Sequence, residues 1–480
     1  MSDFFVDIHC HPTMRAMNTT PLAGRRNHWD ATKNDFTDTS LGRWAWKSSE
    51  AISKHSQSNF YSCIEGNLRV VFDSLYPLER GFVNYKKLPR MIGSEKTFET
   101  MMVSATGLSV KQYRLFKAND DYFADLQEQY QFLKSNEGAS PCGKFSYKLP
   151  NNFSELEQSL AENSDTIHVI VTIEGAHVFG TGRKETQEIP EEDLMLLVQK
   201  NIATVKNWEH PPFFMTFAHH FWNQLCGHST TLKGASKMAC DQSKGLYQGF
   251  TILGKFVLEQ LLSRENGKRI LIDTRHMSVE SRKYYIDFVQ HHNLAHPDDL
   301  IPIISSHSGM NGFDQMQHSV RQKDDHAKIK RTKFFAWSLN ISGEEARAIH
   351  QSKGLAGIML DKGRHSGLNL VKKVEKIKDP VERKEAFVKM LLDCIFCFVG
   401  AINEKSAWDI VTLGTDFDGV IEHFDFYENM STLPQLKSDL IAYLKKTNYQ
   451  QALWFNYEPE ELMSKFFTKN SMEFLKRNFN

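Results

Sequence analysis

The sequence predicts a (β/α)₈ barrel of the TIM type, and three observations support this α/β fold class. Eight short runs rich in Val, Ile and Phe alternate along the chain with stretches of helical pattern. The runs show little alternation of apolar and polar residues, as expected for strands that are covered on both faces. Most runs end in an ionisable residue, and in a barrel the ends of successive strands converge on one face. An open, doubly wound sheet is the alternative, but it does not by itself explain these strand ends.

The predicted strands extend over most of the chain, so residues 1–480 are interpreted as one barrel domain with insertions. We expect strands at residues 4–9, 68–74, 166–174, 213–219, 269–276, 301–307, 355–361 and 409–416. Helix signals lie between them: Pro190 precedes three acidic residues, and Ser342 and Glu345 form a capping-box pattern. The longest gaps follow the first, second and sixth strands, which predicts inserted helices or a lid in those loops.

Length and composition indicate a large globular protein. The chain has 480 residues, well above the roughly 250 of a typical barrel domain, which again requires insertions. Hydrophobic residues make up 41% and charged residues 24%, which is ordinary for a protein with a large core. Lys+Arg and Asp+Glu both number 58, so the formal net charge is zero. This balance argues against a nucleic-acid partner, which usually requires a basic excess.

The sequence shows no sign of a membrane segment or a secretory leader. No run reaches the ~18 apolar residues that span a bilayer, and the first residues lack a basic start followed by an apolar stretch. The seven cysteines are odd in number and irregularly spaced, which suits a reducing compartment. We therefore expect no membrane partner and a cytoplasmic location. Cys394 and Cys397 form a C-x-x-C whose helical, apolar surroundings favour core packing over a redox role.

The first candidate site residues lie at the ends of the first and third predicted strands. His9 and His11 are two residues apart, so their side chains project to the same face of a strand and can approach one ion together. This pair alone could equally be two surface histidines. Glu174 ends a buried strand, where a carboxylate is costly unless it is paired or bound to metal. For His177, in the same motif, a supporting role is favoured over metal binding.

Two further histidines and an aspartate end later strands. His276 and His307 end the fifth and sixth predicted strands, and Asp416 ends the eighth. Asp418 lies in the following turn, where a capping role is favoured. Four histidines and one carboxylate suit two divalent metal ions, with zinc as the first candidate. Two such ions can hold a hydroxide between them while a nearby carboxylate moves its proton, which is hydrolase chemistry.

The order of these motifs resembles the membrane (renal) dipeptidase family of the amidohydrolase superfamily. The similarity extends from Asp7 to the carboxy-terminal segment 460–470 and so covers nearly the whole chain. Its most specific segments are IEGAH at 173–177, IDTRHMS at 272–278, SSHS at 305–308 and GTDFDG at 414–419. The resemblance implies that Glu174 bridges the two metal ions. It places one ion on His9 and His11 and the other on His276 and His307.

The resemblance also implies roles for residues that contact the substrate. Asp416 would be the catalytic acid/base. His219 matches the family histidine that contacts the substrate and its tetrahedral intermediate, and Asn223 would follow it in the same substrate-binding loop. The neighbouring His220 is interpreted as a bystander. Because members of the family are often homodimers, a homodimer is expected on the same ground.

The sequence departs from the family pattern in two places. The family has H-x-D on its first strand, whereas the second member here is His11, which removes one negative charge from the metal site. The family's dipeptidases also carry an arginine after the sixth strand that holds the substrate carboxylate, and here that stretch reads Ser338-Leu339-Asn340. Arg321, Arg331 and Arg364 are candidate substitutes. These departures weaken the prediction of a free dipeptide more than that of a hydrolytic centre.

The leading hypothesis is therefore a binuclear metal-dependent hydrolase that cleaves the amide bond of a dipeptide or a similar small amide. A second hypothesis keeps the barrel and the metals but changes the small-molecule substrate to an N-acyl amino acid or a lactone. A third is a barrel without turnover that only binds a ligand or partner. The third is least favoured, because every predicted ligand position holds a residue able to bind metal.

Overall fold

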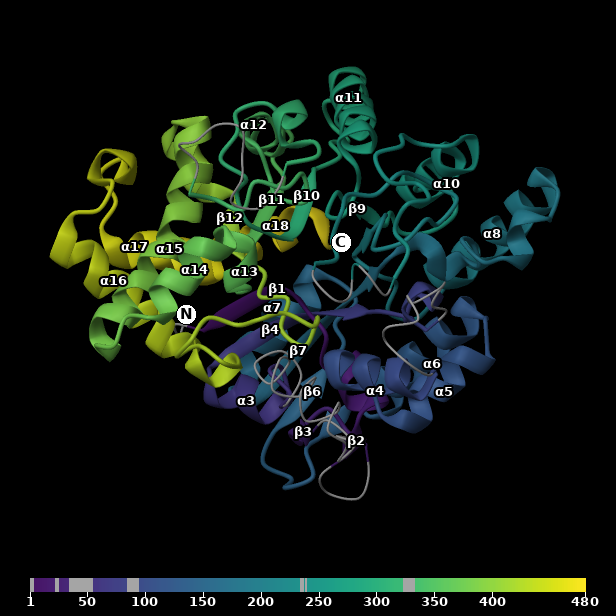
Figure 1. Ribbon diagram of the computed structural model, residues 1–480, viewed down its shortest axis with the longest axis horizontal. Helices are drawn as coiled ribbons and strands as arrows, with labels where there is room; N and C mark the ends of the chain where they lie inside the picture. The colour runs from purple at the N-terminus through teal and green to yellow at the C-terminus, as the bar shows by residue number, and fades with distance from the viewer. Residues whose placement is uncertain are drawn as a thin grey trace.

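The computed structural model describes residues 4–21, 26–33, 55–83, 95–233, 237, 240–322 and 333–480. Its centre is a barrel of eight parallel strands in the order β1-β4-β7-β8-β9-β10-β11-β12, with helices outside it (Figure 1). The barrel strands are β1 (Phe5–Cys10), β4 (Leu68–Leu75), β7 (Thr166–Glu174), β8 (Phe214–Thr216), β9 (Leu271–Asp273), β10 (Ile304–Ser308), β11 (Leu355–Ile358) and β12 (Val411–Leu413).

Backbone hydrogen bonds next to the last and first strands close the barrel. The Asp416 amide donates to the His9 carbonyl at 2.9 Å, and the His11 amide donates to the Phe417 carbonyl at 2.9 Å. Cys10 and Phe417 form a parallel bridge at the same place. The predicted (β/α)₈ fold class is therefore confirmed. Each predicted run overlaps one observed strand. Four of these strands, β8, β9, β11 and β12, end three residues earlier than predicted, because their runs also include the first loop residues after the sheet.

Helices pack around the barrel between successive strands. Those that follow the middle and later strands are α8 (Glu191–Lys206), α10 (Ile252–Leu262), α11 (Val279–Ala295), α12 (Gly343–Gln351) and α15 (Pro380–Ile402). The capping box predicted at Ser342 is present at the start of α12. The final helix, α18 (Asn470–Asn478), packs at the amino-terminal end of the strands, where Phe474 contacts Phe213 with ring centroids 5.9 Å apart.

Insertions lie in several loops, including two that the sequence did not predict. The loop after β1 holds α1 (Pro12–Asn18), β2 (Thr20–Pro21), β3 (Thr32–Lys33) and α3 (Phe60–Glu65). The loop after β4 holds η1 (Arg80–Phe82), α4 (Glu95–Thr106), α5 (Val110–Ala118), α6 (Tyr122–Ser135), β5 (Gly138–Ala139), β6 (Ser146–Lys148) and α7 (Phe153–Glu162). The described part of the loop after β10 contains only the short η4 (Met316–Ser319) before α12. The unpredicted insertions are the long connection after β8, residues 217–251, and α13 (Lys362–His365) with α14 (Leu368–Glu375) after β11.

The remaining elements are short 3₁₀ turns and the carboxy-terminal helices. They are η2 (Ala176–Phe179), η3 (Glu185–Gln187), η5 (Lys405–Asp409), η6 (Met430–Thr432), α16 (Leu433–Thr447), η7 (Gln451–Trp454), α17 (Pro459–Ser464) and the π-helical η8 (Lys465–Lys469). Cys394 is fully buried in α15 and Cys397 is largely so, which agrees with the packing role predicted for them. Within the described ranges, no helix has the length and apolar character needed to cross a membrane.

Candidate metal centre

The predicted metal-binding residues meet at the carboxyl end of the barrel strands. His9 lies on β1, and His11 immediately precedes α1. Glu174 is the last residue of β7, His307 lies on β10, and His276 follows β9. All five side chains are at least 94% buried. The chain thus brings together residues that are up to 298 positions apart (His9 to His307).

The Glu174 carboxylate is the geometric centre of this cluster. Its Oε2 lies 3.1 Å from His11 Nε2, and its Oε1 lies 3.5 Å from His9 Nε2. The same Oε1 lies 3.6 Å from His276 Nε2 and 3.5 Å from His307 Nε2. His9, His11 and Glu174 form one group of possible ligand atoms within 4.8 Å of one another, and Glu174, His276 and His307 form a second. Glu174 is common to both groups, as a bridging ligand would be.

Hydrogen bonds behind the imidazoles direct their Nε2 atoms toward this carboxylate. The Ser306 hydroxyl donates to Asp273 at 2.6 Å, so it accepts from His307 Nδ1 at 2.8 Å. The Ser74 carbonyl accepts from His11 Nδ1 at 2.9 Å. With the proton on Nδ1, each Nε2 presents a lone pair to the centre, which is the tautomer that a metal ligand needs.

The donor set fits divalent transition ions. Nε2 of His9 and Nε2 of His11 are buried and have no hydrogen-bond partner within the described residues. Buried polar atoms without a partner are costly, and an ion bound at these lone pairs would compensate for that cost. Imidazole nitrogens with a carboxylate are the ligands that zinc and similar ions prefer.

Two residues of the centre have backbone conformations that side chains rarely adopt. His276 has φ of 67° and Asp416 has φ of 61°. Left-handed backbone at a residue other than glycine costs on the order of 1–3 kcal/mol and tends to occur at functional sites. Gly419 allows the chain to pass next to Asp416, because a Cβ at position 419 would lie 1.9 Å from Asp416 Oδ1. The fold therefore holds both side chains in orientations that an ordinary strand end would not give.

Asp416 lies beside one half of the cluster and faces the cavity. Its Oδ1 is 3.5 Å from His11 Nε2 and 3.8 Å from His9 Nε2. Burial raises the pKa of this carboxyl group above its ordinary value. Asp418, in contrast, accepts hydrogen bonds from the Gln57 and Ser58 amides and so ties the first loop to the last one. This position agrees with the structural role predicted for Asp418.

His219 reaches the same carboxylate from the loop after β8 and is held by a residue that the sequence did not predict. Its Nε2 lies 3.5 Å from Glu174 Oε1, and its Nδ1 lies 2.7 Å from Glu79 Oε2. Burial disfavours the ionised form of Glu79, but the charge and hydrogen bond of His219 outweigh this and lower the pKa of Glu79 to about 2. Glu79 also accepts hydrogen bonds from the His220 and Phe221 amides, so it fixes this loop.

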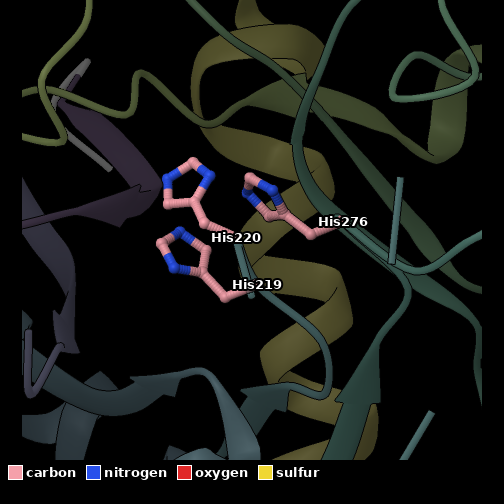
Figure 2. Close-up of side chains that lie close together, drawn as sticks. All are labelled: His219, His220 and His276. Carbon is pink, nitrogen blue, oxygen red and sulfur yellow. The ribbon is translucent and has the colours of Figure 1, made fainter. Parts of the chain in front are cut away.

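His220 lies closer to the centre than the sequence suggested. Figure 2 shows His219, His220 and His276 with their rings gathered together, and each offers a nitrogen within 4.8 Å of the others. His220 Nδ1 shares a hydrogen bond of 2.6 Å with the Thr231 hydroxyl. The interpretation of His220 as a bystander is therefore corrected: its ring lines the cavity. A histidine pair gives no sequence signal that tells which ring faces the site.

Two other predictions, for Asn223 and His177, have different outcomes. Asn223 is buried and does not line the cavity, because its side chain donates to the Phe217 carbonyl and accepts from the Leu225 and Cys226 amides. His177 Nε2 lies 2.8 Å from the Pro77 carbonyl, in agreement with its supporting role.

A cavity of about 350 Å³ opens over the cluster. Glu174, Asp416, His219, His276 and His307 line its floor. Of the three arginines considered as carboxylate ligands, Arg364 lines the cavity, Arg321 does not and instead lies over the Tyr247 ring, and Arg331 is outside the described residues. Leu339 of the Ser338-Leu339-Asn340 stretch also lines it.

Comparison with known proteins supports the fold. No family model matches the sequence, and no curated protein is similar to it in sequence. The solved structure of the probable dipeptidase PvdM from Pseudomonas aeruginosa is 13% identical, with 88% of each chain covered and a TM-score of 0.51. This chain shares the fold of PvdM. The shared fold agrees with the fold that the resemblance to the dipeptidase family implies.

Two further solved structures match over most of their length at lower TM-scores. The dipeptidase AC, a metallo peptidase, is 15% identical, with 93% of this chain and 97% of that chain covered and a TM-score of 0.46. A metallo peptidase from Rhodobacter sphaeroides, liganded with a phosphinate mimic of the dipeptide L-Ala-D-Ala, is 14% identical. That match covers 94% of this chain and 100% of the other, with a TM-score of 0.47.

Proposed function

We propose that this chain is a metal-dependent hydrolase that cleaves the amide bond of a small substrate. The observation that carries the proposal is the Glu174 carboxylate, which has Nε2 atoms of five histidines within 3.1 to 3.6 Å. Glu174 would be shared by two divalent ions, with His9 and His11 holding one and His276 and His307 holding the other. Zinc is the first ion to test.

The ions would supply the nucleophile and polarise the scissile carbonyl, since two bound metals lower the pKa of water and act as Lewis acids. The chain itself must position the substrate, stabilise developing charge and move a proton. His219 is placed to stabilise the developing charge. Glu79 holds its Nδ1 and favours a second proton on the ring, so Nε2 can donate to the carbonyl oxygen as negative charge develops there.

Asp416 is placed to move the proton. It lines the cavity beside His9 and His11, and its left-handed backbone fixes the carboxyl group at the floor. A carboxyl group at this place can take a proton from the attacking water and pass it to the leaving nitrogen. Amide cleavage then gives a carboxylic acid and an amine.

A dipeptide is the first substrate class to test, because PvdM, whose fold this chain shares, is described as a probable dipeptidase. The test measures metal content on purified protein together with hydrolysis of L,L- and L,D-dipeptides and N-acyl amino acids. About two ions per chain with cleavage of an amide are expected. His276→Ala should lower the content by one ion. Protein that holds no metal at His9, His11 and Glu174 would overturn the proposal.

A further inference from the structure

The cavity has two walls of opposite character on opposite sides of the barrel. The first wall comes from the loops after β1 and β4, the first two strands in the barrel order. The second comes from the loops after β9, β10 and β11, the fifth to seventh strands. Glu174, at the end of the third strand, lies on the floor between them. A substrate whose reacting bond sits over Glu174 must therefore extend toward both walls.

The first wall is apolar. We call it the apolar wall, and it consists of Met14, Leu78, Phe82, Met102, Leu108 and Leu232, the last from the loop after β8. These side chains belong to a hydrophobic cluster that is separate from the barrel core and includes residues of α4 and α5. Among the described cavity-lining residues from the loops after β1 and β4, none is Asp, Glu, Lys or Arg. This wall offers no partner for the ammonium group of a free dipeptide, but it suits an apolar group.

We call the second wall the basic wall, because it carries two guanidinium groups, those of Arg275 and Arg364. Arg275 is 3% exposed, and no carboxylate of the described residues lies within 4.0 Å of it. Its Nη1 donates to Ser308 Oγ at 3.3 Å and to the Leu339 carbonyl, while its buried Nε has no partner. Burial, with the nearby charge of Arg364, lowers the pKa of Arg275 to about 9.

Arg364 is only partly neutralised. Its Nε lies 3.6 Å from Asp361 Oδ2, and its Nη2 donates to the Thr231 carbonyl at 2.7 Å. Its buried Nη1 has no partner in the part of the chain that the structure describes. Glu422, which lines the cavity from the loop after β12, lies 3.3 Å from Lys362 Nζ. Two neighbouring guanidinium groups, each with one unpaired buried N–H, are a binding site for an anion such as a carboxylate.

We propose that the substrate is an N-acyl amino acid, with its carboxylate at the basic wall and an extended acyl group against the apolar wall. This assignment rests on the proposed hydrolase function. Water adds to the amide carbonyl, the C–N bond breaks, and the nitrogen receives a proton from that water. The products are an apolar carboxylic acid and a free amino acid. Arg275 and Arg364 thus replace, from other loops, the arginine that the Ser338-Leu339-Asn340 stretch lacks.

The acyl side is tested with N-acetyl-, N-hexanoyl- and N-decanoyl-alanine on the metal-loaded protein. kcat/KM should rise about three- to fourfold per methylene until the cavity is filled. Thr106 is half-buried and lines the cavity at the end of α4. Thr106→Phe should therefore lower the decanoyl-to-acetyl ratio of kcat/KM by about tenfold or more. Ratios that do not depend on chain length would overturn the assignment of the acyl group.

The carboxylate side is tested with N-decanoyl-alanine against N-decanoyl-alaninamide. The wild-type protein should prefer the acid by about 10- to 100-fold, mainly through KM, since a charged hydrogen-bonded pair is at stake. Arg364→Met should remove most of this preference, and Arg364→Lys should retain part of it. Arg321→Met is the matched control, because Arg321 is exposed and does not line the cavity. A preference that survives Arg364→Met unchanged would overturn the assignment of the basic wall.

A binding measurement separates this assignment from the proposed function. N-decylsulfonyl-alanine has the same two ends but a sulfonamide that is not cleaved in this way. Calorimetry should show that it binds, and that Arg364→Met weakens its Kd by about 10- to 100-fold. If the protein cleaves dipeptides but its activity depends neither on acyl chain length nor on Arg364, the hydrolase proposal stands and the N-acyl substrate is wrong. If binding of the sulfonamide depends on chain length and on Arg364 but no amide is cleaved, the cavity assignment stands and the hydrolase proposal is wrong.

Discussion

The floor and the walls of the cavity are built in different ways. The floor uses side chains at or just after strand ends, such as Glu174 and His307, which belong to the closed sheet. Hydrogen bonds behind the rings of His11 and His307 orient these two side chains. The walls use side chains from loops and inserted helices, such as Met102 on α4 and Arg364 on α13. Catalytic groups require exact placement, which a rigid barrel gives, whereas binding surfaces tolerate variation in loops. Under the proposed function, the floor would determine the reaction and the walls would determine the substrate.

Removing the central carboxylate should have the largest effect, because both halves of the floor share it. Glu174→Gln is expected to lower the metal content to below one ion per chain and the activity by about 10³-fold or more. Metal content is measured by elemental analysis and activity on the best amide found. The control is Glu191→Gln, an exposed residue at the start of α8. Full metal content in Glu174→Gln would show that the two halves do not depend on a shared ligand.

Asp416→Asn should separate proton transfer from metal binding within the floor. The amide keeps the shape of the side chain but cannot move a proton, so turnover should fall by about 10²- to 10⁴-fold while both ions remain. Metal content and amide hydrolysis are measured as for Glu174→Gln. Loss of metal from this variant would instead make Asp416 a metal ligand through its position beside His9 and His11.

Glu79 tests the boundary between floor and wall, because it lies in a loop but holds His219. Glu79→Gln should lower kcat by about 10- to 100-fold with little change in metal content, since the ring loses the charge that orients it and favours its second proton. Partial recovery in Glu79→Asp would indicate that the carboxylate is what matters. An equal loss of kcat and of metal would place Glu79 among the residues that support the ions.

The smallest effect is expected outside the cavity. Ser342 caps α12, accepts from the Glu345 amide and does not line the cavity. Ser342→Ala should lower the free energy of unfolding by about 1 kcal/mol, as measured by urea denaturation, and leave kcat/KM unchanged. A loss of activity comparable to that of Glu79→Gln would show that the outer helices affect the catalytic groups of the floor more directly than the contrast between floor and walls suggests.

Sequence analysis located the floor because its signals are local. A β-like run that ends in Glu174, His276 or His307 can be recognised within a few residues, and barrel topology brings such ends to one face. The walls gave no such signal. Leu339 lies in the stretch where the dipeptidase family has its carboxylate-binding arginine, and its own side chain cannot bind a carboxylate. Nothing near Arg364 in the sequence reveals that its guanidinium lines the same cavity.

The sequence by itself determined the barrel, the alternation of strands and helices, and the histidines and acids at the strand ends. Only the tertiary structure decided that Glu79 holds His219, since the two are 140 positions apart, and that Asn223 is used within its own loop rather than at the cavity. It also decided which side of the cavity is apolar and which is basic. The reason is physical: strand patterns record the periodicity of a few neighbouring residues, whereas loop contacts depend on the closure of chain segments far apart in sequence.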